Sequence, residues 1–246
     1  LVRSRGSEMC IRDRDMVDLV EVRADFLDPA ELPLLDRFPR FLGLDAILTI
    51  RRPADGGVFQ SGEEERISFL SRAVQGNWAF LDLETDCRIP SLEKECASRG
   101  IRIIRSFHDL GGVPEDLVTR VKRVRRNEIP KAAVTPQNSA DLLRLLTACR
   151  KINGRDKIIL GMGGFGIITR ILAGRLGSFL SYCSAGKEQA APGHMDPTTM
   201  YAVYRFPFIT SRTELYGIIG NPVAHSFSPR LHNKAFKDLD IDAVYL

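Results

Sequence analysis

The chain has 246 residues, of which 44% are hydrophobic and 27% are charged, and its formal net charge is +4. This length suits one large α/β barrel of about 250 residues or two smaller domains. The mild charge gives no sign of a nucleic-acid partner but suits a small anionic substrate. No apolar run approaches the roughly 18 residues of a membrane helix, so we expect no membrane association.

Residues 1–14 read LVRSRGSEMCIRDR, begin without Met, and show neither helical nor strand periodicity. We interpret this stretch as a non-native leader and exclude it from the fold argument. Five cysteines are scattered without metal-ligand spacing, namely Cys10, Cys87, Cys96, Cys149 and Cys183. An odd count in a chain of this size indicates reduced thiols in a cytoplasmic protein and no metal site.

From residue 15 to residue 206, short apolar runs alternate with longer amphipathic stretches. The runs predict strands at Val17–Ala24, Ala46–Arg51, Ala79–Glu84, Ile101–Phe107, Lys131–Thr135, Lys157–Gly161 and Ser178–Cys183. Helical patterns occupy Glu63–Val74, Ser91–Ser98, Pro114–Arg126, Ala140–Asn153 and Pro197–Phe206. This alternation predicts parallel βα units, and seven strands are one fewer than a closed (β/α)8 TIM barrel needs.

A second unit follows a predicted linker over residues 207–213. Residues 214–246 show a strand at Leu215–Ile219, a turn, a helix at Pro229–Leu239, and the start of another strand at the end of the sequence. A βαβ unit needs its second strand to bury its helix. The tail therefore reads as a truncated α/β fragment of a second domain.

Charged residues lie within or just after several of the apolar strands: Glu21, Arg23, Arg51, Glu84, His108 and Lys131. A charge in an apolar strand costs stability unless it is paired or functional. In a barrel the carboxyl ends of the strands build the active site, so these residues are candidates for it.

Lys131 and His108 carry the candidate chemistry. A desolvated lysine can attack a ketone, and a histidine can take and return a proton near neutral pH. Taken singly, each has a simpler reading, a snorkelling lysine and a half-buried structural histidine. Their pairing on neighbouring predicted strands favours the catalytic reading.

Three arginines, Arg23, Arg51 and Arg170, could bind a substrate carboxylate bidentately. Salt bridges to Glu21 or Glu84 are the alternative. The GxGxxG pattern at residues 161–166 follows the sixth strand rather than the first, which disfavours a dinucleotide site and favours binding of a carboxylate. The basic run at residues 120–126 has valines at helical spacing and is read as a solvated helix face.

The motifs occur in one order that resembles the type I 3-dehydroquinate dehydratases over about residues 17–206. They are DLVEVRAD at 18–25, LTIR at 48–51, DGG at 55–57, DLE at 82–84, SFHD at 106–109, PKAAV at 130–134, MGGFGIITR at 162–170 and APG at 191–193. The resemblance implies a TIM barrel that lacks its first βα unit, and a lyase that needs no metal or organic cofactor.

The resemblance also implies roles. Lys131 would form a Schiff base with 3-dehydroquinate, His108 would move its protons, and Asp55, where the family usually has Glu, would orient His108. Arg170 would bind the carboxylate, and Glu21, Arg23 and Arg51 would bind the hydroxyls. His194 stands where the family often has Gln, which alters the closing loop, and Ala190 replaces a frequent Ser.

The tail sequence YGIIGNPVAHSFSPRLHN at 216–233 resembles the opening of shikimate dehydrogenase. This implies that Ser226 and Ser228 bind the shikimate carboxylate, although Ser228 could also cap a helix that has Pro at its first position. The family's NADP domain has no counterpart in this sequence. We therefore expect a piece of a bifunctional enzyme of the shikimate pathway.

Two functions stay open. The first is an active dehydratase, and the second is a catalytically dead fragment whose opened barrel exposes strand edges. We expect a longer parent protein to be active and this chain to be weakly active or inactive. A homodimer is compatible with either. Class I aldolases also use a barrel lysine, but they lack this setting of His108 and Arg170.

Overall fold

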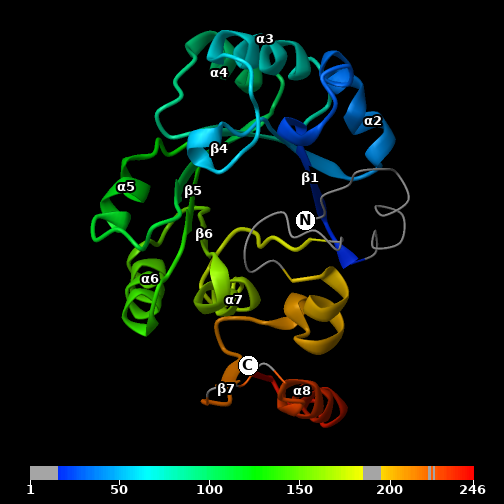
Figure 1. The fold of residues 1–246 in the computed structure, drawn as a ribbon. Helices are drawn as coiled ribbons and strands as arrows, with labels where there is room; N and C mark the ends of the chain where they lie inside the picture. The colour runs from blue at the N-terminus through cyan, green and yellow to red at the C-terminus, as the bar shows by residue number, and fades with distance from the viewer. Residues whose placement is uncertain (1–15, 185–194, 221–222, 224) are drawn as a thin grey trace.

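The computed structural model describes residues 16–184, 195–220, 223 and 225–246. Its main feature is a curled sheet of six parallel strands in sequential order. The strands are β1 (Leu19–Arg23), β2 (Asp45–Thr49), β3 (Phe80–Glu84), β4 (Arg102–Asp109), β5 (Ile129–Val134) and β6 (Ile158–Gly161). Figure 1 shows the sheet as an arc with helices on its outer side, as expected for part of a βα barrel.

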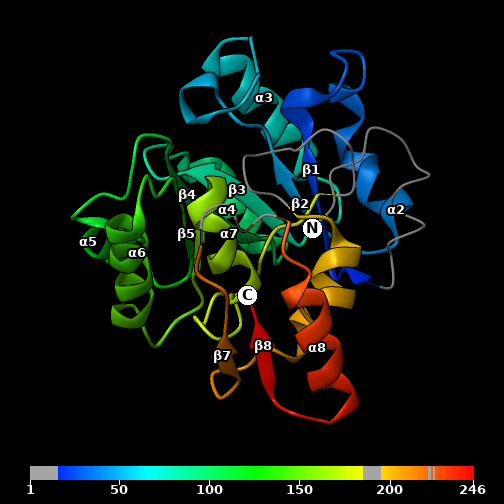
Figure 2. The same ribbon diagram turned by 60° about the horizontal axis from the view of Figure 1, so that its bottom comes forward.

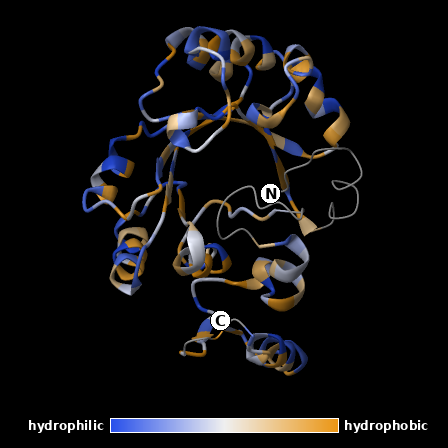
Figure 3. Cartoon of the chain, in the orientation of Figure 1, coloured by the Kyte–Doolittle hydropathy of each residue, from blue (hydrophilic) through white to orange (hydrophobic). Residues whose placement is uncertain are grey.

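The outer layer consists of helices that follow the strands. They are α2 (Phe38–Leu42), α3 (Glu63–Ala73), α4 (Pro90–Ser98), α5 (Leu117–Arg123), α6 (Ser139–Lys151) and α7 (Gly163–Ile171), with short 3₁₀ turns η2 (Ala24–Phe26), η3 (Leu32–Arg37) and η4 (Pro53–Asp55). Leu48, Leu81 and Leu83 of the strands pack against Leu70 of α3 and Leu92 of α4. Hydrophobic positions follow the strands, while hydrophilic positions are frequent on the outer helices (Figure 3).

The predicted seventh strand at Ser178–Cys183 is wrong, because this segment is extended without strand pairing. A single backbone hydrogen bond of the kind that joins paired strands runs from the Phe179 amide to the Lys157 carbonyl at 2.6 Å. The Ser178 hydroxyl then accepts the Ile159 amide at 3.3 Å and donates to the Leu180 carbonyl at 3.0 Å. The Ser178 side chain thus accepts the Ile159 amide hydrogen bond that a paired strand's backbone carbonyl would accept, and strand pairing does not continue.

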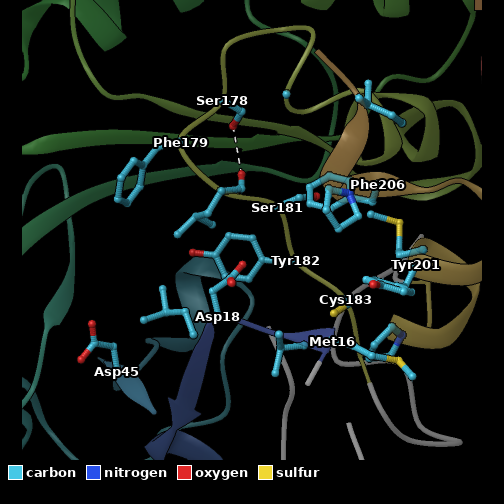
Figure 4. A pocket seen from close by; sticks show the side chains of 18 of the residues that line it. Met16, Asp18, Asp45, Ser178, Phe179, Ser181, Tyr182, Cys183, Tyr201 and Phe206 are labelled. Atoms are coloured by element: carbon cyan, nitrogen blue, oxygen red, sulfur yellow. Dashed lines mark hydrogen bonds between the residues drawn. The ribbon is translucent and has the colours of Figure 1, made fainter. Parts of the chain in front are cut away.

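A pocket of about 490 Å³ lies between this extended segment and the start of β1. Figure 4 shows Tyr182 among the side chains of its lining, with Phe179 and Ser181 from the same segment. The beginnings of β2 and β3 also reach the pocket, through Asp45 and Phe80. The sheet in the described residues is therefore open between β1 and the segment after α7.

Past the barrel part, the predicted helix at Pro197–Phe206 is in large part a π-helix, η5 (Thr199–Val203), followed by the 3₁₀ turn η6 (Phe206–Phe208). Strands β7 (Glu214–Tyr216) and β8 (Ala243–Tyr245) are parallel, and α8 (Ser228–Asp238) connects them. Figure 2 shows β7 and β8 side by side with α8 next to them. The tail thus forms the predicted βαβ unit. None of the described helices is long and apolar enough to cross a membrane.

Candidate active site

The inner face of the sheet has an apolar layer and a polar layer. The apolar layer is a cluster formed by Ile47, Phe80, Ile104, Ile129, Ile158, Leu160 and Tyr182. Side chains alternate along a strand, so the residue two positions later faces the same way. Those positions hold Thr49, Asp82, Ser106 and Lys131, all of them buried. The polar layer therefore lies toward the carboxyl ends of the strands, where the sequence predicted the site.

Lys131 is the third residue of β5 rather than the first residue of a strand, as predicted, and it is only 6% exposed. Its Nζ donates to Oδ2 of Asp82 at 2.8 Å and lies 4.0 Å from Oε1 of Glu21. The nitrogen also lies 4.6 Å from the centre of the Tyr182 ring. The amine thus points into the interior of the sheet and does not snorkel to solvent.

His108 lies on the neighbouring strand β4, opposite Ala133 of β5, whereas Ser106 is opposite Lys131. His108 and Lys131 therefore face the same side and are offset by two residues, about 7 Å along the strands. Burial, followed by the positive charges of Arg51 and Lys131, holds the pKa of His108 well below its usual value of 6.5. The imidazole is therefore neutral at physiological pH and can accept a proton.

The Nδ1 atom of His108 is buried and has no hydrogen-bond partner in the part of the chain that the structure describes. The sequence predicted that Asp55 would orient this ring. Asp55 instead accepts a 2.9 Å hydrogen bond from Nε of Arg52, which also binds Asp86 at 2.8 Å. The predicted contact between Asp55 and His108 is not among the hydrogen bonds of the described residues, although η4, which carries Asp55, packs against β4.

Arg51 connects the two carboxylates of β3. Its guanidinium lies 2.7 Å from Oδ1 of Asp82 and 3.0 Å from Oε1 of Glu84, and it donates to Oγ of Ser106 at 2.7 Å. Burial alone would lower the pKa of Arg51, but the two carboxylates outweigh it and raise the pKa. The alternative reading of Arg51, a salt bridge to Glu84, is thus confirmed.

A second, fully buried arginine supports this network from outside the sheet. Arg66 of α3 donates to Oε2 of Glu84 at 3.0 Å and to the carbonyl of Ile50 at 2.9 Å. Both contacts flank Arg51, one through its carboxylate partner and one through the preceding residue. Arg66 therefore fixes the position from which Arg51 reaches Asp82.

Glu21 and Arg23 of β1 do not pair with each other and have different hydrogen-bond partners. Glu21 accepts a 2.8 Å hydrogen bond from the Thr49 hydroxyl. Arg23 binds Asp25 through two hydrogen bonds of 2.8 and 2.6 Å and stacks over the Phe26 ring at 4.7 Å. Arg23 therefore pairs with Asp25, and not with Glu21 or Glu84 as the alternative reading had it.

Arg170 is 2% exposed, and among the described residues no carboxylate lies within ion-pair distance of it. Its Nε donates to the Gly161 carbonyl at 3.2 Å and its Nη1 to the Tyr182 carbonyl at 3.3 Å. Burial lowers its pKa to about 10. A buried guanidinium that has only carbonyl acceptors is suited to bind an incoming anion.

The glycines before Arg170 allow α7 to pack closely on β6. A Cβ on Gly166 would lie 2.2 Å from the backbone carbon of Gly161, and a Cβ on Gly161 would lie 2.5 Å from Cα of Gly166. These contacts explain the first and last glycines of the GxGxxG pattern, Gly161 and Gly166, by close packing between helix and strand.

Three further predicted site residues lie elsewhere. His194 falls outside the described residues, as do Ala190 and the APG motif. Ser226 and Ser228 belong to the βαβ unit of the tail, where the Ser226 hydroxyl accepts the Ser228 amide at 3.2 Å. Ser228 is the first residue of α8 and Phe227 occupies the cap position, so the reading of Ser228 as the cap is wrong.

Sequence reasoning did not single out two residues next to Lys131. Asp82 contacts both Lys131 and Arg51, and its spacing from Glu84 on one strand could have indicated it. Tyr182 lies in the extended segment that was predicted as a strand, and no sequence signal marked it. Among the described residues, no group of three or more histidine, cysteine, aspartate or glutamate side chains could hold a metal ion.

Comparison with known families gives two adjacent matches. Residues 4–211 match the type I 3-dehydroquinase family, and residues 218–246 match the substrate-binding domain of shikimate dehydrogenase. A 3-dehydroquinate dehydratase of Methanococcus vannielii is 34% identical over 190 residues, which are 74% of this chain and 85% of that protein.

A bifunctional 3-dehydroquinate dehydratase/shikimate dehydrogenase of Arabidopsis thaliana is 32% identical over 238 residues, which are 93% of this chain but 39% of that protein. Among solved structures, the 3-dehydroquinate dehydratase of Geobacillus kaustophilus aligns with a TM-score of 0.75 at 25% identity, over 86% of this chain and 91% of its own. The dehydroquinate dehydratase and shikimate dehydrogenase of S. pombe has a TM-score of 0.67 at 24% identity, and covers 99% of this chain and 51% of its own. The likeness to the S. pombe protein shows a shared fold.

Proposed function

Because the chain belongs to the type I 3-dehydroquinase family, we propose that it dehydrates 3-dehydroquinate to 3-dehydroshikimate through a Schiff base on Lys131. One observation supports this most directly. The Lys131 amine is buried on the inner face of the sheet, and His108 lies on the same face of the next strand. An amine and a neutral base within reach of one small molecule are what this reaction requires.

The first step is imine formation. The Lys131 nitrogen must be neutral to attack the C3 carbonyl, and the low pKa of His108 leaves its imidazole free to receive the proton that the amine gives up. The new C–N bond forms as the carbonyl oxygen leaves as water. The product is a cationic iminium on Lys131.

The second step is elimination. The iminium draws electron density from C2, so His108 can remove the C2 proton and leave a neutral enamine. His108 then returns a proton to the C1 hydroxyl, which leaves as water while the electron pair forms the new double bond and restores the iminium. A second water hydrolyses the imine and releases the product and the amine. Neither step needs a metal or an organic cofactor.

Substrate binding is proposed to rest on the arginines. Arg170 would take the carboxylate, because its guanidinium is buried and makes only carbonyl contacts among the described residues. Arg51, Glu21 and Arg23 would bind the ring hydroxyls in exchange for some of their present partners. Asp55, placed on a turn against β4, would orient His108 in the substrate complex, and His194 would also contact the substrate.

For a longer protein we propose a second activity that begins with the tail. The chain spans 39% of its Arabidopsis relative, and residues 218–246 match the substrate-binding domain of shikimate dehydrogenase. Ser226 and Ser228 would bind the shikimate carboxylate there, and NADP would be needed only by parts beyond this sequence. We place the boundary of the two units within residues 207–213.

A weakly active or inactive chain is the second candidate, and one observation favours it. The sheet has six strands in the described residues, and both β1 and β6 are edges. Open edges lower the stability of a barrel and invite association. A cooperative thermal transition of a monomeric, fully active sample would rule this candidate out.

The test is conversion of 3-dehydroquinate, followed by the ultraviolet absorbance of the conjugated enone that forms. The proposed function predicts turnover by the chain and none by Lys131→Met or His108→Asn. Lys151→Met, at the exposed end of α6, is the matched control and should keep full activity. Turnover that survives Lys131→Met would refute the Schiff base, and no turnover by the unmodified chain would favour the second candidate.

A further inference from the structure

Tyr182 is a buried aromatic residue that touches the reacting nitrogen. It lies in the extended segment after α7 and is 4% exposed. The centre of its ring is 4.6 Å from Nζ of Lys131, within the range of a cation–π contact. Figure 4 shows the ring in the wall of the pocket beside β1, so Tyr182 borders that pocket as well as the polar layer.

The Tyr182 hydroxyl is not suited to act as a base. Burial, followed by the charges of Glu21 and Asp82, raises its pKa well above the usual value of 10. The phenol therefore keeps its proton at any pH at which the enzyme would work. The hydroxyl is buried and has no hydrogen-bond partner among the described residues, so the ring face is the part of Tyr182 that acts on Lys131.

We infer that Tyr182 is a further catalytic residue whose ring stabilises the positive charge on the Lys131 nitrogen in the iminium. This inference rests on the proposed function. In the balanced step, the neutral amine, the ketone and one proton become an iminium and a water. The nitrogen gains a charge that the facing ring attracts through its quadrupole.

The ring contact complements the hydrogen bond to Asp82. An ammonium has three N–H groups, and in the structure one of them points at Asp82. The iminium nitrogen keeps a single N–H, so it can satisfy fewer hydrogen-bond acceptors than the amine did. A ring face attracts the charge without needing an N–H, so its contribution persists through the covalent stage.

The test replaces Tyr182 with Phe and with Phe derivatives that carry one, two or three fluorines. Fluorine withdraws electron density from the ring face but changes its size little, so packing and folding are kept. We measure the rate and the extent of imine formation with 3-dehydroquinate by borohydride quenching. Cation–π attraction predicts that both fall stepwise, about 10-fold in all, while Tyr182→Phe stays close to the unmodified chain.

Each outcome bears on one claim. A flat response along the fluorinated series would overturn the inference, and so would loss of imine formation in Tyr182→Phe, because the hydroxyl would then be the active part. Tyr182→Leu should behave like the most fluorinated ring or worse. If the unmodified chain forms no imine at all, the proposed function fails instead, and the two failures are thereby distinguished.

Discussion

Lys131 and Asp82 form a buried ion pair in which Nζ donates to Oδ2 at 2.8 Å. Arg51 lies 2.7 Å from the other oxygen of the same carboxylate, so Asp82 pairs with two cations at once, and Glu84 supplies a second negative charge to Arg51. Arg51 and Lys131 hold the pKa of Asp82 far below its usual value against the opposing effect of burial. Asp82 therefore holds the Lys131 amine and the Arg51 guanidinium next to each other on the inner face of the sheet.

Replacing Asp82 with Asn should damage both stability and turnover. Breaking a buried ion pair typically costs about 3–5 kcal/mol of unfolding free energy, because the partner charges stay buried. Displacement of the amine by about 1 Å can reduce kcat by roughly 100-fold. Urea unfolding and steady-state assays measure the two effects.

The control for Asp82→Asn is Asp156→Asn, which removes the partner of Arg102 in an exposed pair. Exposed pairs contribute about 1 kcal/mol or less, so this variant should be nearly neutral. Equal stability losses in the two variants would mean that the Asp82 pair is not the buried network described above.

The low pKa of His108 predicts how stability depends on pH. The unfolded chain binds a proton at His108 near pH 6.5, whereas the folded chain does so only well below that pH. The contribution of neutral His108 to the free energy of unfolding is therefore fully present above pH 6.5. It is lost as the pH falls from 6.5 toward the folded pKa, at up to about 1.4 kcal/mol per pH unit.

The pH prediction is checked by denaturant unfolding between pH 7 and pH 5, with and without His108→Asn. In His108→Asn, the unfolding free energy should fall less steeply between pH 7 and pH 5 than in the unmodified chain. NMR of the imidazole gives a second readout, since the chain has four histidines and the variant identifies the signal of His108. An imidazole that titrates at or above pH 6.5 would contradict the assignment of His108 as a neutral base.

Arg170 should show a trade-off between stability and binding. Its buried charge has no carboxylate partner among the described residues, so Arg170→Met should change the unfolding free energy by only about 1 kcal/mol in either direction. The same variant should raise KM for 3-dehydroquinate roughly 100-fold, since a charge-assisted bidentate contact is lost. A large loss of stability with an unchanged KM would show that Arg170 is structural.

Gly166 and Gly164 form a matched pair on α7. A Cβ on Gly166 would collide with the Gly161 backbone, whereas a Cβ on Gly164 meets nothing within 4 Å. Overpacking costs about 1–3 kcal/mol, so Gly166→Ala should destabilise the chain and shift Arg170. Gly164→Ala should be neutral or stabilising by up to about 1 kcal/mol, because alanine favours a helix. Thermal unfolding of both variants decides this.

Much of the site could be predicted from the sequence because strand geometry is regular. Charged residues within or just after apolar strands pointed to the carboxyl ends of a parallel sheet, and Lys131 and His108 were expected on neighbouring strands there. Their shared side follows from the strand register of the structure. The parallel sheet followed from the alternation of strands and helices. The order of the six paired strands agrees with that prediction.

What the sequence could not predict depends on tertiary contacts. Ser178–Cys183 has the composition of a strand, but the Ser178 hydroxyl takes backbone bonds and the pairing ends after Phe179. Asp55 was expected to contact His108, but its carboxylate instead accepts a hydrogen bond from the nearby Arg52. Only the short distance between its ring and the Lys131 nitrogen in the folded structure identifies Tyr182 as part of the site.

Borohydride trapping tests the central claim most directly. The chain is incubated with 3-dehydroquinate, reduced, digested, and mapped by mass spectrometry, with Lys131→Arg treated in parallel. We predict one adduct, on the peptide that contains Lys131, and none in the variant. An adduct on any other lysine, or turnover without an adduct, would contradict the Schiff base on Lys131.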